Sequence, residues 1–239
     1  MPRTEFPRGA FLFDVSLSGC PLDTNRLDER RAMVKDQLEK RGIRDLQVLQ
    51  AMRDIPRHFF VPTQFQNKAY EDGPQSIGSG QTISQPFIVA SMIELIKPQT
   101  TFRVLEVGVG SGYSAAVLSR LVTQVYGVER DSTLLAQVKA KFKETGLSNI
   151  QVKLGDGTLG WKEVSPFDAI LVTAGSPRVP MSLLAQLKVG GVMVIPVGSR
   201  ENQNLVRVVK RSTDNYQEKI LYPVRFVPLI GKEGWPDVV

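Results

Sequence analysis

The glycine-rich segment VLEVGVGSGY, at residues 104–113, restricts the fold more than any other stretch of this chain. It places Gly108, Gly110 and Gly112 between an apolar run that is typical of a buried strand and the helix-like run GYSAAVLSRLV. Glycines at a strand-to-helix turn let the backbone come close to a ligand, and the amino end of the helix faces that ligand. A turn that binds nothing would need one glycine rather than three. The segment therefore predicts a ligand-binding strand–turn–helix unit.

Strand-like and helix-like runs alternate from residue 102 onward. The strand-like runs are FRVLEVG, QVYGVE, IQVKLGD, FDAILVT and VMVIPVG, and helix-like runs separate most of them. The tail, LVRVVKR and EKILYPVRFVPL around a turn at Asp214 and Asn215, indicates a late β hairpin. Alternating strands and helices predict a mostly parallel sheet with helices on both faces. The expected fold class is α/β, a Rossmann-like doubly wound sheet with N-terminal helices and a C-terminal β hairpin.

The part of the chain before residue 102 reads as helical. A first helix is expected to end at Gly42, a second to begin at Asp45 and end before Pro56, and a third to cover QPFIVASMIELIK. The stretch YEDGPQSIGSG reads as a loop because of its glycines and proline. We therefore expect an irregular extension at residues 1–22 and one domain at residues 23–239. Within that domain, residues 23–98 form a helical part with a substrate loop, and residues 102–239 form the α/β core.

The composition argues against several classes of protein. Lys and Arg number 30 against 24 Asp and Glu, which gives a net charge of +6, but the basic residues are scattered, so we expect no nucleic-acid partner. The one cysteine, Cys20, excludes a disulfide framework, and the one histidine, His58, leads us to expect no metal site. We read His58 as structural.

Targeting signals are weak. No stretch reaches the roughly 18 consecutive apolar residues of a membrane span, so we expect no membrane partner. The N-terminal LSGC sequence resembles a bacterial lipoprotein cleavage site, but Asp14 interrupts the apolar run before it and Glu5 lies in its basic flank. We therefore expect a plain extension and a cytoplasmic protein.

The acid inside the glycine-rich segment indicates the kind of ligand. A dinucleotide fingerprint requires a third glycine where this chain has Tyr113, and Glu106 would repel a pyrophosphate. A nicotinamide-dependent dehydrogenase is therefore disfavoured. Glu106 suits a cationic ligand, such as the sulfonium and amino groups of S-adenosylmethionine.

Two further acids follow the next two strands. Glu129 ends QVYGVE, where a carboxylate can accept hydrogen bonds from both hydroxyls of a ribose. The alternative is a surface acid beside Arg130. Asp156 and Gly157 follow IQVKL, where the acid can receive an adenine amino group, or it can form an ordinary Asx turn.

Together these motifs resemble the class I S-adenosylmethionine-dependent methyltransferases, and the chain from about residue 30 to about residue 229 resembles the protein-L-isoaspartate O-methyltransferases. The resemblance is carried by IPRHFFVP, AYEDGPQSIGSGQTISQPFIVASM, VLEVGVGSGYSAAVLSRLV, GDGTLGW and PFDAILVTAG, and by LLAQLKVGGVMVIPVG and VRFVPL. The glycine loop is specific only to the class, whereas GQTISQP and VRFVPL are specific to the family. Val109 departs from the family pattern, because many relatives have Thr or Ser at that position.

The resemblance implies a repair enzyme. Such an enzyme would move a methyl group from S-adenosylmethionine to the free α-carboxylate of L-isoaspartyl residues in damaged proteins and peptides, and the ester would then cyclise to a succinimide. By resemblance, Ser84 is the active-site hydroxyl and also binds substrate, together with Arg225 and Val227 in a strand that covers RFVPL. The expected cofactor-binding residues are Thr82, Ile83, Glu106, Gly108, Gly110, Gly112, Glu129, Asp156 and Gly157. We expect a monomer.

Alternatives to this function remain at the level of sequence. One is a methyltransferase of the same fold that acts on a small molecule or RNA, and another is a binding module that has lost turnover. The GQTISQP block argues against the first, and the intact Ser84 argues against the second. Ser84 itself has an alternative role as the cap of the helix that begins near Pro86.

Overall fold

The computed structural model describes residues 26–237, so the expected extension at residues 1–22 and its LSGC sequence lie outside the described part. The first helix of the described part is α1 (Leu27–Ala32), which continues as a π-helical segment (Met33–Glu39). The next helix is α2 (Leu46–Asp54). Gly42 follows the first helix with φ of 101°, a conformation that favours glycine. The Asp45 side chain caps α2 by accepting hydrogen bonds from the Gln47 and Val48 amides. Both helix boundaries are as predicted.

A short β hairpin occupies the stretch that we expected to be a loop. β1 (Gln75–Gly78) and β2 (Gln81–Ile83) pair antiparallel, and the residues of the tip, Gly78, Ser79 and Gly80, all have positive φ. The loop interpretation was wrong because the strands are too short to show an alternating pattern, while the tip has turn composition. Ile77 and Ile83 anchor the hairpin to the core, and α3 (Pro86–Leu95) follows directly.

The described residues form a seven-stranded sheet, whose strand order is β5-β4-β3-β6-β7-β8-β9. Its parallel part consists of β3 (Arg103–Val107), β4 (Gln124–Glu129), β5 (Ile150–Leu154), β6 (Phe167–Val172) and the start of β7 (Leu187–Gly198). β8 (Gln203–Lys210) and β9 (Tyr216–Val224) add antiparallel to β7 and form the predicted C-terminal hairpin. The first strand of the sheet, β3, lies in its interior, with β4 on one side and β6 on the other, so the chain adds later strands in both directions from β3. Open α/β sheets bind their ligands at such a switch point, beyond the carboxyl ends of the strands.

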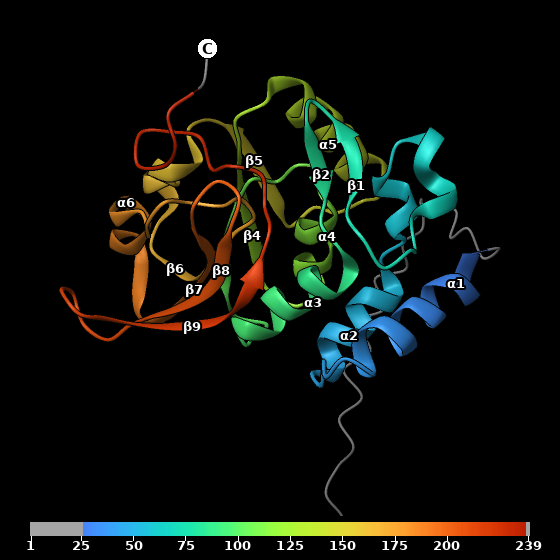
Figure 1. The fold of residues 1–239 in the computed structure, drawn as a ribbon, viewed down its shortest axis with the longest axis horizontal. Coiled ribbons are helices and arrows are strands. Elements are labelled where there is room, and N and C mark those ends of the chain that lie inside the picture. The colour runs from blue at the N-terminus through green and yellow to red at the C-terminus, as the bar shows by residue number, and fades with distance from the viewer. Residues whose placement is uncertain (1–25, 238–239) are drawn as a thin grey trace, which may run out of the picture.

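Helices lie on both sides of the sheet (Figure 1), and apolar side chains pack on both of its faces. The larger cluster joins one face to α2, α3, α4 (Tyr113–Ser119) and α5 (Ser132–Glu144), and the smaller one joins the other face to α6 (Met181–Ala185). Short 3-10 turns at Arg57–Phe60, Thr63–Lys68, Gly157–Leu159 and Lys162–Val164 connect these elements. The α/β fold class is confirmed. The larger cluster includes residues of both expected parts, 23–98 and 102–239. That these parts form a single domain at residues 23–239 stays a prediction.

The RFVPL segment is not a strand, contrary to our expectation. β9 ends at Val224, and residues 225–229 leave the edge of the sheet to cross the end of β6. There the Gly175 amide donates to the Val227 carbonyl, and the Leu229 amide donates to the Gly175 carbonyl, both at 2.8 Å. The segment thus pairs with a loop at the end of the parallel strands, which a strand pattern alone does not reveal.

Candidate active site

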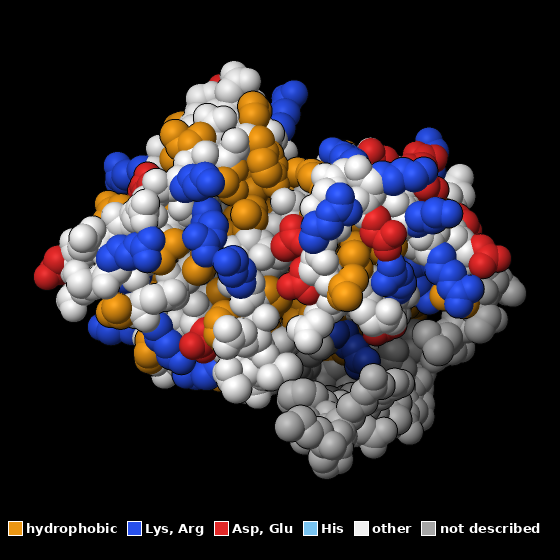
Figure 2. All heavy atoms as spheres, turned by 90° about the horizontal axis from the view of Figure 1, so that it is seen from below, with side chains coloured by type: hydrophobic (Ala, Val, Ile, Leu, Met, Phe, Trp, Pro, Cys, Tyr) orange, Lys and Arg blue, Asp and Glu red, His pale blue; other side chains and the backbone are white. Residues whose placement is uncertain are grey.

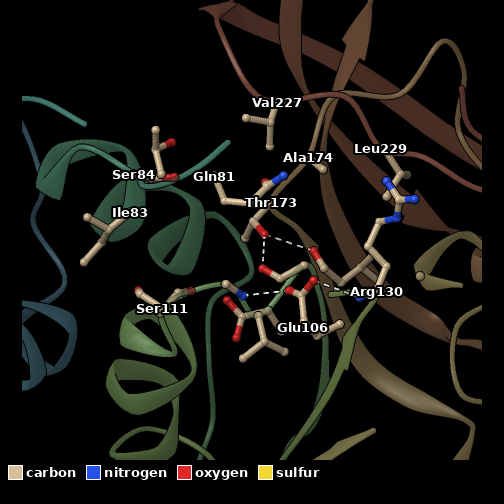
Figure 3. A pocket seen from close by; sticks show the side chains of 18 of the residues that line it. Gln81, Ile83, Ser84, Glu106, Ser111, Arg130, Thr173, Ala174, Val227 and Leu229 are labelled. Carbon is tan, nitrogen blue, oxygen red and sulfur yellow. Dashed lines mark hydrogen bonds between the residues drawn. The ribbon is translucent and has the colours of Figure 1, made fainter. Parts of the chain in front are cut away.

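A cavity of about 360 Å³ lies at the carboxyl ends of β3, β4 and β6. Its size falls within the range of small-molecule sites. Four parts of the chain line it: the β1–β2 hairpin with the start of α3, the glycine-rich loop, the ends of β4 and β6, and the segment that follows β9. Figure 3 shows Ser84 and Val227 toward one end of this pocket and Glu106 toward the other.

Glu106 is the most unusual group in the pocket. It lies on the central strand β3, its side chain has no solvent exposure, and neither carboxylate oxygen has a hydrogen-bond partner among the residues of the described chain. Burial raises the pKa of Glu106 to about 8, opposed in part by the Ser114 hydroxyl, which lies near the carboxylate without good hydrogen-bond geometry, and assisted by the charge of Glu129. A buried carboxylate without partners is costly unless a cationic or donor group completes it. The site therefore fits the cationic methionine part of S-adenosylmethionine.

Glu129 fixes the shape of the glycine-rich loop. Its Oε2 accepts a hydrogen bond from the Gly110 amide at 2.9 Å, and its Oε1 accepts from the Arg130 and Asp131 amides at 2.8 and 2.9 Å. Glu129 is 6% exposed, so the alternative of a surface acid is wrong. Each carboxylate oxygen has two lone pairs, so these three hydrogen bonds leave one acceptor position, on Oε2, for a ribose hydroxyl.

Thr173 lines the opposite side of the loop, just past β6. Its hydroxyl lies 2.5 Å from the Gly108 carbonyl oxygen and 3.0 Å from that of Val107. This contact joins the ends of β3 and β6 at the floor of the pocket (Figure 3). Sequence analysis did not single out Thr173, although its place directly after the apolar run FDAILV could have indicated it.

Ser84 reaches the pocket from the short connection between β2 and α3. The N-cap of α3 is Gln85, without a side-chain capping bond, so the interpretation of Ser84 as the helix cap is wrong. Thr82 and Ile83 line the pocket beside Ser84, and Val227 lines it from the segment after β9. The hydroxyl of Ser84 is thus placed to face a bound molecule.

Not every predicted site residue lines the pocket. Glu106, Gly108, Gly110, Glu129 and Gly157 do, whereas Gly112, Asp156 and Arg225 do not. Asp156 Oδ1 accepts from the amide and hydroxyl of Thr158, and its Oδ2 accepts from the Lys232 amide at 2.8 Å. This geometry favours the Asx-turn alternative, and an adenine contact by Asp156 stays a prediction. Lining residues that the sequence analysis did not name include Ser79, Gln81, Arg130, Asp131, Ala174 and Ile230.

Gly112 acts through packing behind the loop, which gives a testable result. It is the N-cap of α4 with φ of 86°, and an added Cβ would lie 2.3 Å from Val138 Cγ2 on α5. We expect Gly112→Ala to lower the free energy of unfolding by about 3 kcal/mol, from backbone strain and overpacking together. Gly42→Ala is the matched control, because Gly42 has φ of 101° and nothing within 4 Å of an added Cβ. Equal losses in urea denaturation of the two variants would contradict the packing role.

The described residues 26–237 contain no group of three or more His, Cys, Asp or Glu side chains that could hold a metal ion. None of the helices in that range combines the length and apolarity needed to cross a bilayer. The site therefore consists of buried acids, a glycine-rich loop and hydroxyls.

A seven-stranded sheet with an acid and a glycine-rich loop at its switch point defines a class I S-adenosylmethionine-dependent methyltransferase. Comparison with known proteins narrows this class. A sequence model of the family described as "Protein-L-isoaspartate(D-aspartate) O-methyltransferase (PCMT)" matches residues 28–234. The chain belongs to this protein-L-isoaspartate O-methyltransferase family, and it is an enzyme that uses S-adenosylmethionine.

Relatives and solved structures agree with that assignment. A protein-L-isoaspartate O-methyltransferase of Pelotomaculum thermopropionicum is 54% identical over 216 residues, which cover 90% of this chain and 94% of the relative. Another such protein, from Pelobacter propionicus, is 52% identical over 217 residues, which cover 90% and 96%. A solved structure of a putative family member from Plasmodium falciparum, in complex with S-adenosyl-L-homocysteine, superposes with a TM-score of 0.74 at 26% identity and covers 84% of this chain and 98% of its own. These matches support the repair enzyme and not the alternative acceptors.

Proposed function

We propose that this pocket carries out the isoaspartyl reaction, with Ser84 orienting the substrate carboxylate and Glu106 and Glu129 holding the cofactor. The single observation that supports it is the placement of Ser84 and Glu106 in one cavity, from elements about twenty residues apart in sequence. When bound, S-adenosylmethionine supplies an electrophilic methyl group on a positively charged sulfur. Glu106 is the one fully buried, unpartnered acid in that cavity among the described residues, and it would stabilise this charge.

The acceptor needs little activation from the protein. A carboxylate has a pKa of about 4, so the substrate is already a nucleophile near pH 7 and no general base is required. Alignment of the reacting atoms can contribute roughly 7–11 kcal/mol in favourable cases. Ser84 would donate one hydrogen bond to the carboxylate oxygen that does not react, which fixes the orientation of the oxygen that does.

The product leaves the enzyme as a methyl ester of the isoaspartyl residue. The backbone nitrogen of the next residue then attacks the ester carbonyl, methanol leaves, and a succinimide forms. Hydrolysis of the succinimide opens either of its two C–N bonds and returns part of the material as normal aspartate. The enzyme thus repairs over several cycles.

The proposed reaction also bears on the binding partners and the cellular compartment of the enzyme. We infer that the enzyme acts as a monomer in the cytoplasm on proteins and peptides and does not bind nucleic acid. Ser84 and Val227 line the pocket and are both half-buried, so a polypeptide could reach them from the surface.

Methyl transfer to two matched peptides tests this function. One peptide contains L-isoaspartate and the other contains aspartate at the same position, and both receive labelled S-adenosylmethionine. We expect base-labile label on the first peptide only. Label on both peptides, or on neither while the cofactor still binds, would contradict the proposed acceptor.

A further inference from the structure

Three cationic side chains gather on one face of the β8–β9 hairpin. Arg207 on β8 lies directly opposite Lys219 on β9 in the antiparallel register, so the two side chains share a face. Arg211 extends this group at the end of β8, where it donates a hydrogen bond to Gln217 Oε1 at 2.5 Å. Arg211 and Lys219 are exposed, and Arg207 is half-buried. We call Arg207, Arg211 and Lys219 the cationic hairpin face.

Among the residues that the structure describes, none of the three cations makes an ion pair. Burial lowers the pKa of Arg207, and the positive charge of Arg211 lowers it further. Like charges directly opposite each other on a sheet destabilise it. Arg207 has a partner inside the fold, whereas the exposed Arg211 and Lys219 pair with no acid of the described residues, which suggests that these two charges are used outside the fold.

Figure 2 agrees with this placement. It shows the molecule from below, where Lys and Arg side chains predominate over a few Asp and Glu in the left half of the view, whereas both kinds of charge are closely interspersed in the right half. The half-buried Arg207 side chain reaches the end of α3, where its Nε donates to the Leu95 carbonyl at 2.9 Å. Arg207 thus anchors the cationic hairpin face to α3, and Arg211 and Lys219 supply its exposed charge.

The cationic hairpin face connects along the chain to the substrate end of the pocket. From Lys219, β9 continues to its end at Val224, and the chain goes on to Val227, which lines the pocket. The Tyr222 hydroxyl lies 2.6 Å from the Ser91 hydroxyl on α3, so this stretch packs beside the helix that follows Ser84. Lys219 precedes Val227 by about eight residues, a span of at most roughly 26 Å at 3.3 Å per extended residue. An extended polypeptide of similar length can therefore reach from one to the other.

We infer that the cationic hairpin face binds acidic side chains of the substrate polypeptide, about five to eight residues from its isoaspartyl residue. This inference rests on the proposed function, because a substrate chain held in the pocket must leave it across the surface. It makes the enzyme selective for isoaspartyl sites within acidic segments. A polypeptide fits better than a nucleic acid because the strand that carries the cations leads directly to the pocket.

The test compares isoaspartyl peptides of one sequence that contain three Glu or three Gln residues, five to eight positions to either side of the isoaspartate. With Glu on the favoured side, we expect kcat/KM to be about three- to tenfold higher at low salt, mainly through a lower KM, since each exposed ion pair contributes little. The preference should disappear at high ionic strength. Arg211→Gln combined with Lys219→Gln should bring the ratio between the two peptides to about one.

Charge-matched variants and a competing ligand complete the experiment. Lys139→Gln with Lys143→Gln, both exposed on α5, removes the same charge elsewhere and should keep the preference. Equal kcat/KM for Glu and Gln peptides in the parent enzyme, or a preference that survives Arg211→Gln with Lys219→Gln, would overturn the inference. The inference would also be overturned if the parent enzyme bound single-stranded DNA and these two substitutions abolished that binding but left the peptide selectivity unchanged. Failure to methylate any isoaspartyl peptide would instead refute the proposed function.

Discussion

Replacing Glu106 with glutamine is expected to stabilise the cofactor-free protein while it weakens the binding of S-adenosylmethionine. Glu106 is fully buried, and its pKa is raised to about 8, above the ordinary value of 4.5, chiefly by burial. Glutamine has nearly the same shape and no charge to desolvate. The same substitution would remove the negative charge that we propose attracts the cationic part of S-adenosylmethionine, so we expect the dissociation constant to rise by about 100-fold, as for a hydrogen-bonded charge pair.

The pH dependence has a definite sign. Because the folded-state pKa is raised, the folded protein binds the proton more tightly than the unfolded chain does. Stability from this group is fully present below about pH 4.5 and is lost progressively as the pH rises through about 8. At pH 9 the Glu106→Gln variant should exceed the parent in free energy of unfolding by about 3–5 kcal/mol, since one pKa unit corresponds to about 1.4 kcal/mol.

Two measurements check this prediction together. Urea denaturation of the cofactor-free parent and variant should give a difference that grows from pH 5.5 to pH 9. Titration calorimetry should show that the parent binds S-adenosylmethionine more tightly as the pH rises toward 8, by up to about tenfold per pH unit, and that the variant lacks this part of the dependence. A constant stability difference across this range would mean that Glu106 is ionised in the free protein.

Ser84→Ala is the second change with a large expected effect. Loss of one hydrogen bond to a charged carboxylate costs about 1.5–3 kcal/mol, so kcat/KM for an isoaspartyl peptide should fall roughly 10- to 150-fold. The dissociation constant of S-adenosylmethionine and the melting temperature should change little, because Gln85 and not Ser84 is the N-cap of α3.

The variant Ser84→Thr is the matched control because it keeps the hydroxyl. It should recover most of the activity that Ser84→Ala loses. If Ser84→Ala lowered cofactor affinity and peptide methylation equally, the serine would shape the pocket instead of orienting the carboxylate.

Much of the fold could be predicted from sequence because its signals are local. Asp45 and Gly42 mark helix ends through backbone hydrogen bonding and a positive φ. Apolar runs such as FDAILV must be buried on both faces of a parallel sheet. The glycines and Glu106 predict the cofactor end of the site for the same reason, since they lie close to one another in the chain.

The remainder depends on contacts between distant segments. The hairpin at residues 75–83 is stable because Ile77 and Ile83 meet the core, which its turn-like composition conceals. Residues 225–229 pair with Gly175 rather than extending β9. The side chain of Asp156 is engaged by Lys232, which is 76 residues away. Sequence patterns show what a residue favours but not which distant partner it meets.

The central claim is that one pocket brings the methyl group to the free α-carboxylate of an isoaspartyl residue. Mass spectrometry of an isoaspartyl peptide over the course of the reaction tests it most directly. We predict one methyl group on that carboxylate, then the succinimide, then a growing fraction of the normal aspartyl peptide. A methyl group on any other atom of the peptide, or an ester that forms without later conversion to aspartate, would contradict the account.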